Sequence, residues 1–470
     1  MRKTKIICTI GPASEDEKTL RELCLAGMNV ARLNFSHGSY EEHGARIEKI
    51  KRLRKELSLP IAIMLDTKGP EYRIGCFENG KIELHEGDEF TLTTRQEMGD
   101  QNHVSVSYAG LCAELKPGDQ VLINNGLLVL SVLEADKENA RCVVQNGGIL
   151  SDKKSMSVPG RVFSHDYLSE QDKKDLLFGI ENDVDFIACS FVSRKQDLLD
   201  VHEFLHEHGG DSIDIIAKIE NRSGVDNIDE ICECCDGIMV ARGDLGVEIP
   251  FEELPAVQKK LITKCRLLGK RVITATEMLE SMINNVRPTR AEISDVANAV
   301  YDGTSALMLS GETAQGKYPV HTVEIMARIA VQAENTIHYD KRFRQTAFHI
   351  KNETDAISHA VCGMAIDVGA KLIVVCSLSG MTARMVSRFR APTDILGITT
   401  DEKTWRKLAL SWGVTPAMSD YFDSTDVLFF NAKNTAKKMF PLEKGDFIII
   451  TGGLPSHSSG NTNMIKADRI

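Results

Sequence analysis

The sequence DIIAKIENR, residues 214–222, begins as a buried strand and then places two charged side chains, Lys218 and Glu220, among its isoleucines. Because successive side chains of a strand point to opposite faces, residues two positions apart share one face. The ammonium of Lys218 and the carboxylate of Glu220 are therefore expected on the same side of the strand. They form either a structural ion pair or part of a reaction centre.

Apolar runs of this kind recur along the chain, and each is followed by a segment with helical periodicity. The first helix is expected to open at Ser14, with Glu17 completing a capping box, and to close near Gly27. Strands that read as continuous apolar runs are typical of a parallel sheet covered on both sides. Eight strand–helix units predict an α/β fold, a parallel (β/α)8 TIM barrel. The expected strands are KIICTI (5–10), MNVARL (28–33), IAIMLD (61–66), VDFIACSF (184–191), IDIIAKI (213–219), GIMVAR (237–242), RVITAT (271–276) and SALMLS (305–310).

This count of eight units requires an insertion after the third strand. The inserted segment alternates short apolar runs with Gly, Asn and Asp, which predicts an all-β domain. A long helix is expected to end near Tyr339, and a charged connector (341–355) leads into further alternating strands and helices. The predicted domains are a barrel of residues 1–69 and 168–343, a β insertion of residues 70–167, and a C-terminal α/β domain of residues 344–470 with strands near 371–377, 394–400 and 446–453.

Composition excludes several classes of protein. With 42% hydrophobic and 26% charged residues over 470 positions, the chain matches a globular protein of two or three domains. No apolar run is long enough for a membrane span. The apolar run that follows the basic N-terminus ends at Gly11 and Pro12 and is too short for a signal peptide, so we expect a cytoplasmic protein. The net charge of −11 argues against nonspecific nucleic-acid binding. Twelve scattered cysteines predict reduced thiols, and Cys232 and Cys235 lack the second pair or histidines of a zinc site.

Polar side chains collect where the predicted barrel strands end, which is the face that carries the active site in such barrels. A buried ion pair adds little stability over an apolar pair, so catalysis explains Lys218 beside Glu220 better than structure does. Glu220 and Asp244 come from adjacent strands and suit a shared Mg²⁺ or Mn²⁺. Taken alone, Ser36, Thr67 and Ser310 are more typical of helix caps. The strand-end residues are Arg32, Asn34, Ser36, His37, Asp66, Thr67, Lys68, Glu71, Arg73, Lys218, Glu220, Arg242, Gly243, Asp244, Thr274, Thr276, Glu277, Ser310 and Glu312.

The C-terminal region contains two loops that suit a phosphate. The segment CSLSGMTARMVSRF (376–389) follows a strand and opens a helix, so its amides and hydroxyls favour an anion site, with an ordinary helix cap as the equal alternative. The loop TGGLPSHSSGNT (451–462) is expected to form the other wall. No P-loop or GxGxxG motif occurs. The candidate effector residues are Ser377, Ser379, Gly380 and Thr382.

Eight separate motifs make the chain resemble the pyruvate kinase family over essentially its whole length. Agreement at that many positions, in family order, is far more specific than one glycine-rich loop. The motifs are CTIGP (8–12), MNVARLNFSHG (28–38), LDTKGPE (65–71), AKIEN (217–221), IMVARGDLGVEI (238–249), TATEMLESM (274–282), RPTRAE (287–292) and MLSGETAQGKYP (308–319).

The resemblance implies phosphoryl transfer from phosphoenolpyruvate to ADP, giving ATP and pyruvate, by a homotetramer with a mobile β lid and a regulatory C-terminal domain. Its effector would be a sugar phosphate or a nucleotide. It implies catalytic roles for Lys218, Arg32, Arg73 and Thr276; substrate contacts by Arg32, Gly243, Asp244 and Thr276; Mg²⁺ or Mn²⁺ at Glu220 and Asp244; K⁺ at Asn34, Ser36, Asp66 and Thr67; and nucleotide contacts by Asn34, His37, Arg73 and Lys154, with Lys153 as the alternative to Lys154. Glu71 is the residue seen in K⁺-dependent members.

Some positions depart from the family pattern. Asn124-Asn125-Gly126 replaces an Asp-Asp-Gly of the lid, Glu277 stands where Gln is common, and FSHDYLSEQD (163–172) is unusual. The second C-terminal loop lacks an arginine. From the chain length we expect no extra C-terminal domain of the kind that some bacterial members carry. Two other hypotheses compete with an active pyruvate kinase: a lyase of the phosphoenolpyruvate and pyruvate barrel type, which would need no ADP, and a silent metabolite sensor, which would bind without turnover.

Overall fold

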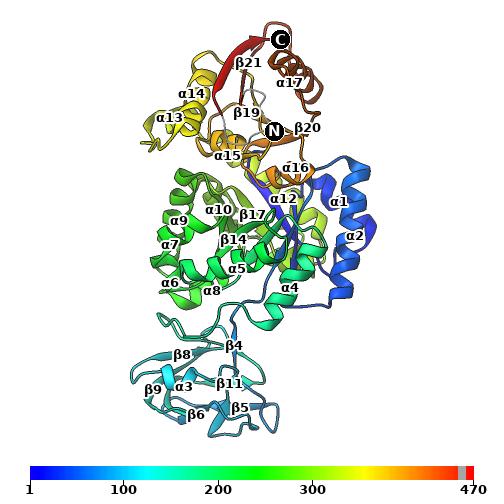
Figure 1. Ribbon diagram of the computed structural model, residues 1–470. Coiled ribbons are helices and arrows are strands. Elements are labelled where there is room, and N and C mark those ends of the chain that lie inside the picture. The colour runs from blue at the N-terminus through cyan, green and yellow to red at the C-terminus, as the bar shows by residue number, and fades with distance from the viewer. Residues whose placement is uncertain (454–461) are drawn as a thin grey trace.

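The computed structural model describes residues 1–453 and 462–470, and its centre is a closed barrel of eight parallel strands (Figure 1). The strands follow one another around the barrel in the order β1-β17-β16-β15-β14-β13-β3-β2. All eight predicted strands are present, so the predicted fold class is confirmed. The strands are β1 (Lys5–Thr9), β2 (Val30–Asn34), β3 (Ala62–Asp66), β13 (Phe186–Cys189), β14 (Asp214–Ile219), β15 (Gly237–Ala241), β16 (Arg271–Ala275) and β17 (Ala306–Leu309).

Helices surround the barrel, and the start of the first one differs from the prediction. The helix begins after Asp16, whose side chain accepts a hydrogen bond from the Thr19 amide at 3.0 Å. Ser14 instead accepts a hydrogen bond from the Gly11 amide, within the preceding turn. The end at Gly27, in the left-handed conformation, is confirmed. The helices are α1 (Glu17–Ala26), α2 (Tyr40–Leu57), α4 (Glu170–Glu181), α5 (Lys195–Glu207), α6 (Arg222–Asp226), α7 (Ile228–Cys234), α8 (Arg242–Glu248), α9 (Leu254–Leu268), the 3-10 helix η1 (Glu280–Ile283), α10 (Arg290–Asp302), α11 (Gly311–Ala314) and α12 (Pro319–Thr336).

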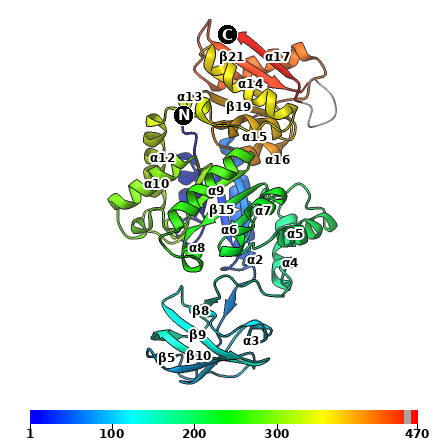
Figure 2. The same cartoon turned by 90° about the vertical axis from the view of Figure 1, so that its left-hand side faces the viewer.

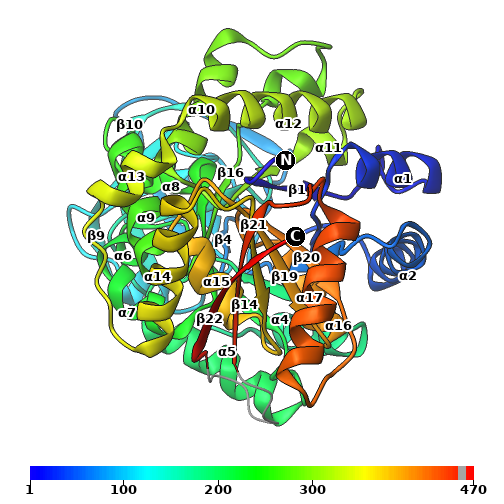
Figure 3. The same ribbon diagram turned by 90° about the horizontal axis from the view of Figure 1, so that it is seen from above.

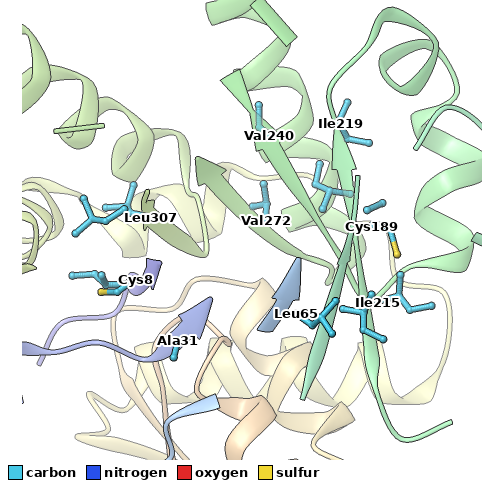
Figure 4. Close-up of a cluster of buried hydrophobic side chains, with 14 of the residues drawn as sticks. Cys8, Ala31, Leu65, Cys189, Ile215, Ile219, Val240, Val272 and Leu307 are labelled. Atoms are coloured by element: carbon cyan, nitrogen blue, oxygen red, sulfur yellow. The ribbon is translucent and has the colours of Figure 1, made fainter. Parts of the chain in front are cut away.

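The barrel strands are buried on both faces, which explains their continuous apolar sequences. One face packs against the helices, where Ile215, Val240 and Leu307 belong to a large apolar cluster (Figure 4). The other face fills the barrel interior, with Ile216 and Met239 among its members. Because Lys218 is two residues after Ile216 in β14, it points to the interior side, at the carboxyl end of the barrel.

The predicted β insertion follows β3 and has its own apolar core, which includes Phe90, Val121 and Leu130. It forms a seven-stranded sheet, β4-β12-β8-β9-β10-β6-β7, and a two-stranded sheet, β11-β5. Figures 1 and 2 show it at one end of the barrel, opposite the C-terminal domain. Its elements are β4 (Tyr72–Arg73), β5 (Lys81–Leu84), β6 (Glu89–Thr93), β7 (His103–Ser105), α3 (Leu111–Glu114), β8 (Gln120–Ile123), β9 (Leu128–Ala135), β10 (Asn139–Asn146), β11 (Gly148–Ser151) and β12 (Ser155–Ser157).

The C-terminal α/β domain contains the sheet β20-β19-β18-β21-β22, in which only β22 is antiparallel to its neighbour. Helices α14 and α15 cover one face and α17 covers the other (Figure 3). The three predicted strands are confirmed, whereas β20 and β22 were not predicted. The elements are α14 (Glu353–Asp367), β18 (Leu372–Cys376), α15 (Met381–Arg388), β19 (Asp394–Thr399), α16 (Glu402–Leu408), β20 (Val414–Met418), α17 (Thr425–Met439), β21 (Phe447–Gly452) and β22 (Met464–Arg469).

The connector between the barrel and this domain also differs from the prediction. Helix α12 ends at Thr336, and part of the segment predicted as a charged connector belongs to the helix α13 (Tyr339–Gln345). Tyr339 packs against Trp412 and Phe343 against Phe389, with ring centroids 5.3 and 6.4 Å apart. Aromatic contacts with the C-terminal domain therefore order part of the charged connector.

Two further observations concern the cysteines and the helices. All twelve cysteines are free thiols. None of the helices within residues 1–453 and 462–470 is both long and apolar enough to cross a membrane.

Ion pairs join helix α16 of the C-terminal domain to the barrel. Arg406 donates to the carboxylate of Asp185 at 2.7 Å and to that of Asp183 at 2.7 Å. Asp185 is fully buried, and burial raises its pKa above the ordinary value although Arg406 opposes this rise. Breaking a buried pair from one side is costly because the remaining charge lacks compensation.

We predict that Arg406→Met lowers the free energy of unfolding by about 3 kcal/mol, because the buried Asp185 loses its nearest cation. Thermal and urea unfolding would measure the change. The matched control is Arg344→Met, because Arg344 pairs with Asp367 on the surface, where side chains are 58% and 62% exposed, and it should change little. Equal effects of the two substitutions would contradict the importance of the α16 contact.

Candidate active site

The charged side chain that interrupts β14 is held by three groups at the carboxyl end of the barrel. The ammonium of Lys218 lies 2.6 Å from Ser190 Oγ, 3.0 Å from Asp66 Oδ1 and 3.1 Å from Glu220 Oε1. Ser190 directly follows β13, and Asp66 ends β3. Lys218 and Glu220 therefore form an ion pair on one side of their strand, as the sequence predicted, within a larger network.

Asp66 holds a second cation on its other oxygen. Arg32 Nε donates to Asp66 Oδ2 at 2.6 Å, and Arg32 Nη1 donates to Thr9 Oγ1 at 2.9 Å. Burial raises the pKa of Asp66, but the charges of Arg32 and Lys218 outweigh it and leave this pKa below its ordinary value. For Lys218, burial lowers the pKa, and the carboxylates of Asp66 and Glu220 outweigh burial and raise it. Lys218 is therefore held as an ammonium at neutral pH.

Glu220 and Asp244 are the two carboxylates expected to hold a divalent cation. Glu220 Oε2 accepts a hydrogen bond from the Phe191 amide at 2.7 Å, and Asp244 lies in the first turn of α8. Burial raises the pKa of Glu220; Lys218 lowers it, and the negative charge of Asp244 raises it further. Both residues line a cavity of about 180 Å³ between the barrel and the β insertion.

The oxygen donors of this cavity suit Mg²⁺ that is bound partly by water and substrate. They do not suit a metal ion whose ligands all come from the protein. No group of three or more His, Cys, Asp or Glu residues that could hold a metal ion occurs in the described part of the chain. Mg²⁺ is commonly bound by one or two carboxylates together with water and substrate phosphate oxygens. Two mutually repelling carboxylates, Glu220 and Asp244, at one cavity fit that pattern.

The turn after β16 places a hydroxyl beside the start of α8. Thr276 Oγ1 accepts a hydrogen bond from the Gly243 amide at 2.8 Å, so the two groups predicted to bind a substrate carboxylate are neighbours. Thr276 and Glu277 have φ angles of 65° and 53°, in the left-handed region that non-glycine residues rarely adopt. Such strain persists only where surrounding contacts fix the backbone.

Arg242 supplies the contacts that fix this turn. Its Nε and Nη2 donate to the backbone carbonyl of Thr276, and Nη1 donates to both carboxylate oxygens of Asp295 at 2.6 and 2.8 Å. The fixed fork of the guanidinium makes these contacts together, which an ammonium cannot do. Arg242 therefore positions Thr276 without reaching the cavity itself.

The residues predicted to bind K⁺ are only partly brought together. Asn34 and Asp66 are register partners at the ends of β2 and β3, and Thr67 follows directly. Ser36 lies beyond them in an exposed turn, where its amide donates to Asn34 Oδ1 at 3.2 Å. Amide, carboxylate and hydroxyl oxygens on adjacent strand ends are the donor types of a monovalent cation site. His37 is exposed next to Ser36, and its backbone carbonyl lies 2.8 Å from a ring nitrogen of His43.

Arg73, by contrast, does not join the barrel cations. Its guanidinium pairs with Glu71 at 2.8 Å and donates to the Lys153 carbonyl at 2.9 Å. The carbonyl of Lys154 accepts a hydrogen bond from the Ile74 amide, which orders the backbone there. The β insertion therefore holds Arg73 with its own residues in this structure.

The asparagines that replace the usual Asp-Asp have a conformational role. Asn124 and Asn125 both have φ of 55°, in the turn that joins β8 and β9. Asparagine tolerates this left-handed conformation better than most residues. Ser155 Oγ donates to Asn125 Oδ1 at 3.3 Å, and the Asn124 amide donates to the Ser155 carbonyl. The turn is therefore tied to β12, at the edge of the cavity.

Several residues of the site were not predicted from the sequence. Ser190 bonds Lys218, Tyr167 donates to the Ser190 carbonyl at 2.6 Å, and Phe191, with φ of 57°, turns its amide toward Glu220. The signal for Ser190 was available, because it is a polar residue near the end of an otherwise apolar strand. Tyr167 lies in the segment 163–172 that departs from the family pattern, so this segment supports the site.

The candidate effector loop lies between β18 and α15. Gly380 is the N-cap of α15, with φ of 74°, and no side chain caps the helix. Thr382 Oγ1 lies 2.6 Å from Thr462 Oγ1, which brings the two loops together at one point. Residues 454–461 of the second loop lie outside the described residues. Ser377 and Ser379 complete the first loop.

An α/β barrel whose carboxyl end holds a charged lysine and arginine beside two carboxylates suits a phosphotransferase. Two family models match the chain: pyruvate kinase, barrel domain, over residues 1–323, and pyruvate kinase, alpha/beta domain, over residues 355–467. Curated pyruvate kinases from Clostridium acetobutylicum and Clostridium perfringens are 47% and 46% identical to it over 100% of both chains. One from Geobacillus stearothermophilus is 48% identical over 100% of this chain and 80% of its own length. The chain belongs to the pyruvate kinase family.

The solved structures agree with this assignment. A crystal structure of a pyruvate kinase from Cryptosporidium parvum matches with a TM-score of 0.94 and 40% identity, covering 100% of this chain and 96% of that chain. The family comprises phosphotransferases that convert phosphoenolpyruvate and ADP to pyruvate and ATP. The first of the three functional hypotheses is therefore confirmed at the level of the family.

We predict that Arg242→Lys lowers the turnover number roughly 10- to 100-fold, because the Thr276 turn loses its fixed fork of donors and relaxes. Steady-state kinetics would measure the change, with thermal unfolding to show that the barrel is intact. Arg52→Lys is the matched control, because Arg52 pairs with Glu17 on the surface of α2. Wild-type turnover in Arg242→Lys would show that the turn does not need this clamp.

Proposed function

We propose that this pyruvate kinase performs phosphoryl transfer at the Lys218 network. The observation that carries the proposal is the arrangement of Lys218 and Arg32 on the two oxygens of Asp66, with Glu220 next to Lys218. Phosphoryl transfer needs little covalent chemistry and much positioned positive charge. Two buried cations fixed by one buried anion provide such charge without reorganisation.

In this proposal each group acts on a different part of phosphoenolpyruvate. Lys218 stabilises the charge on the phosphoryl group in transfer, and Arg32 holds phosphate oxygens. Arg73 would join Arg32 only by leaving its ion pair with Glu71. The Gly243 amide and the Thr276 hydroxyl bind the substrate carboxylate. Mg²⁺ or Mn²⁺ bound by Glu220 and Asp244 would neutralise phosphate charge. After transfer the enolate must gain a proton on carbon, and the Thr276 hydroxyl belongs to the relay that delivers it.

The β insertion supports the reaction as a lid. Its residues Asn125, Ser155 and Arg161 line the same cavity as Glu220 and Asp244. Water in the site could accept the phosphoryl group, so a domain that covers the cavity protects the reaction. We assign the lid to residues 70–167, between the two barrel segments 1–69 and 168–343.

The further sites follow from the residues that match the family. K⁺ would bind at Asn34, Ser36, Asp66 and Thr67, and the nucleotide would contact Asn34, His37, Arg73 and Lys154. A sugar phosphate or nucleotide effector would bind at Ser377, Ser379, Gly380 and Thr382, in a regulatory domain of residues 344–470. We further propose a cytoplasmic homotetramer.

The direct test of the function is pyruvate production from phosphoenolpyruvate with Mg²⁺ and K⁺, with and without ADP. We expect turnover only with ADP. Pyruvate formed at the same rate without ADP would favour a different reaction, and binding of phosphoenolpyruvate without turnover would favour the silent sensor. Repeating the assay with candidate sugar phosphates and AMP would identify an effector.

We predict that Lys218→Met lowers the turnover number at least about 100-fold, because the ammonium interacts more strongly with the transition state than with the bound substrate. Binding of phosphoenolpyruvate, measured by calorimetry, should be largely retained. The control is Lys195→Met, which removes a surface ammonium that pairs with Glu233. Unchanged turnover in Lys218→Met would remove the proposed role.

We predict that Glu71→Lys reduces the K⁺ requirement, because the new ammonium supplies a monovalent positive charge near the cation site. The substitution also frees Arg73 from its ion pair with Glu71. Turnover measured against K⁺ concentration would show a smaller stimulation than in the wild type. Glu78→Lys makes the same charge change on the exposed surface of the lid. An undiminished K⁺ requirement in Glu71→Lys would count against the monovalent site.

A further inference from the structure

A second cluster of cations lies far from the active site, where the C-terminal domain packs on the barrel. Helix α15 contacts α9 there (Figures 1 and 3). Residues of both parts line a small cavity close to the start of β16. The barrel and the C-terminal domain each contribute three cations to its lining. These are Arg266, Lys270 and Arg271 from the barrel and Arg384, Arg388 and Arg390 from the C-terminal domain.

The positive charge of this cavity is only half compensated. Three of its cations form ion pairs: Arg271 with Asp214, Arg384 with Asp236 and Arg388 with Asp355. Arg266, Lys270 and Arg390 have no carboxylate within ion-pair distance among residues 1–453 and 462–470. Lys270 donates to the carbonyl of Cys235 instead. The lining therefore has six cations and three paired carboxylates, which leaves three positive charges without a carboxylate partner among the described residues.

The same lining concentrates buried donors that lack an acceptor. Thirteen buried side-chain N and O atoms in the described part of the chain have no hydrogen-bond partner, and seven belong to residues that line this cavity. Arg266 makes no side-chain hydrogen bond in that part of the chain, although it is 8% exposed and both its Nε and its Nη1 are buried. The seven atoms are Nε and Nη1 of Arg266, Nε of Arg271, Arg384, Arg388 and Arg390, and Oγ of Ser411.

Ordinary structural contacts account for only part of this arrangement. Arg390 lies over the ring of Trp412, 4.5 Å from its centroid, and donates to Ser305 Oγ and to backbone carbonyls. Arg266 has no such compensation. A buried charge without a partner costs several kcal/mol, so a fold that retains one is expected to gain from an anion there.

We propose that this cavity binds a small phosphate-class oxyanion that links the barrel to the C-terminal domain. Guanidinium groups recognise the oxygens of phosphate through pairs of N–H donors, and five arginines line the cavity. The space between these side chains is about 10 Å³, roughly what one water needs, so it excludes a whole metabolite. Binding of a phosphate therefore requires the arginine side chains that line the cavity to move apart. Bound between Arg266 and Arg390, the anion satisfies donors from both domains at once.

Trp412 provides a local probe of this site. The chain has two tryptophans, Trp405 and Trp412, so the variant Trp405→Phe leaves the ring beside Arg390 as the single indole emitter. We would titrate this protein with inorganic phosphate at constant ionic strength, using gluconate as the bulky replacement anion. A saturable change in Trp412 fluorescence is expected, together with a phosphate-dependent rise in Tm.

Arg266→Met is the decisive variant, because it removes an unpaired charge and no hydrogen bond. The apparent affinity for phosphate should weaken at least about tenfold, while Tm in phosphate-free buffer should not fall. Arg52→Met, on the barrel surface, should leave the titration unchanged. Phosphate bound at the active site or the effector loop would give a response that Arg266→Met retains.

A parallel titration with a sugar monophosphate shows whether the ligand is free phosphate or the phosphate group of an ester. Because free phosphate is the smaller of the two ligands, we expect it to give the Arg266-dependent response. An Arg266-dependent response to the ester would support the site with a phosphate monoester as its ligand. The proposal would be overturned by the absence of any saturable response, or by equal phosphate affinity in the wild type and Arg266→Met.

Discussion

The active site depends on one buried carboxylate, that of Asp66. It ends β3 and accepts hydrogen bonds from Arg32 of β2 and from Lys218 of β14 on separate oxygens. Two cations placed this close would repel each other, and burial would raise the cost of each. The anion between them removes that conflict. The barrel is what allows the arrangement, because it brings the carboxyl ends of strands from distant parts of the chain to one face.

The fold and many site residues could be predicted from the sequence because both follow from periodicity. Strands buried on both faces give continuous apolar runs, and a polar residue at the end of such a run must lie at the carboxyl face of a parallel barrel. Lys218, Glu220 and Asp66 were found in this way. Strands β20 and β22 were missed because they are the two edges of their sheet, where apolar runs are interrupted by Pro416 or by charged residues.

Other features could not be predicted because they arise from contacts between distant residues. Lys218 and Asp66 are 152 positions apart, and Lys218 and Ser190 are 28 apart, so no local pattern pairs them. The left-handed conformation of Thr276 is imposed by Arg242, and its own sequence does not favour it. The N-terminus of α1 was also predicted at the wrong residue. Ser14 and Asp16 are both good N-cap residues, but Ser14 is used by the turn at Gly11, so Asp16 caps the helix.

The turnover number of Asp66→Asn tests the central role of this carboxylate most directly. The substitution preserves the size of the side chain, removes its charge and presents an amide to two cations. We predict that turnover falls about 100-fold in a protein that circular dichroism shows to be folded, because Lys218 and Arg32 lose their common anchor. A folded Asp66→Asn protein with wild-type turnover would contradict the claim that Asp66 positions the catalytic cations.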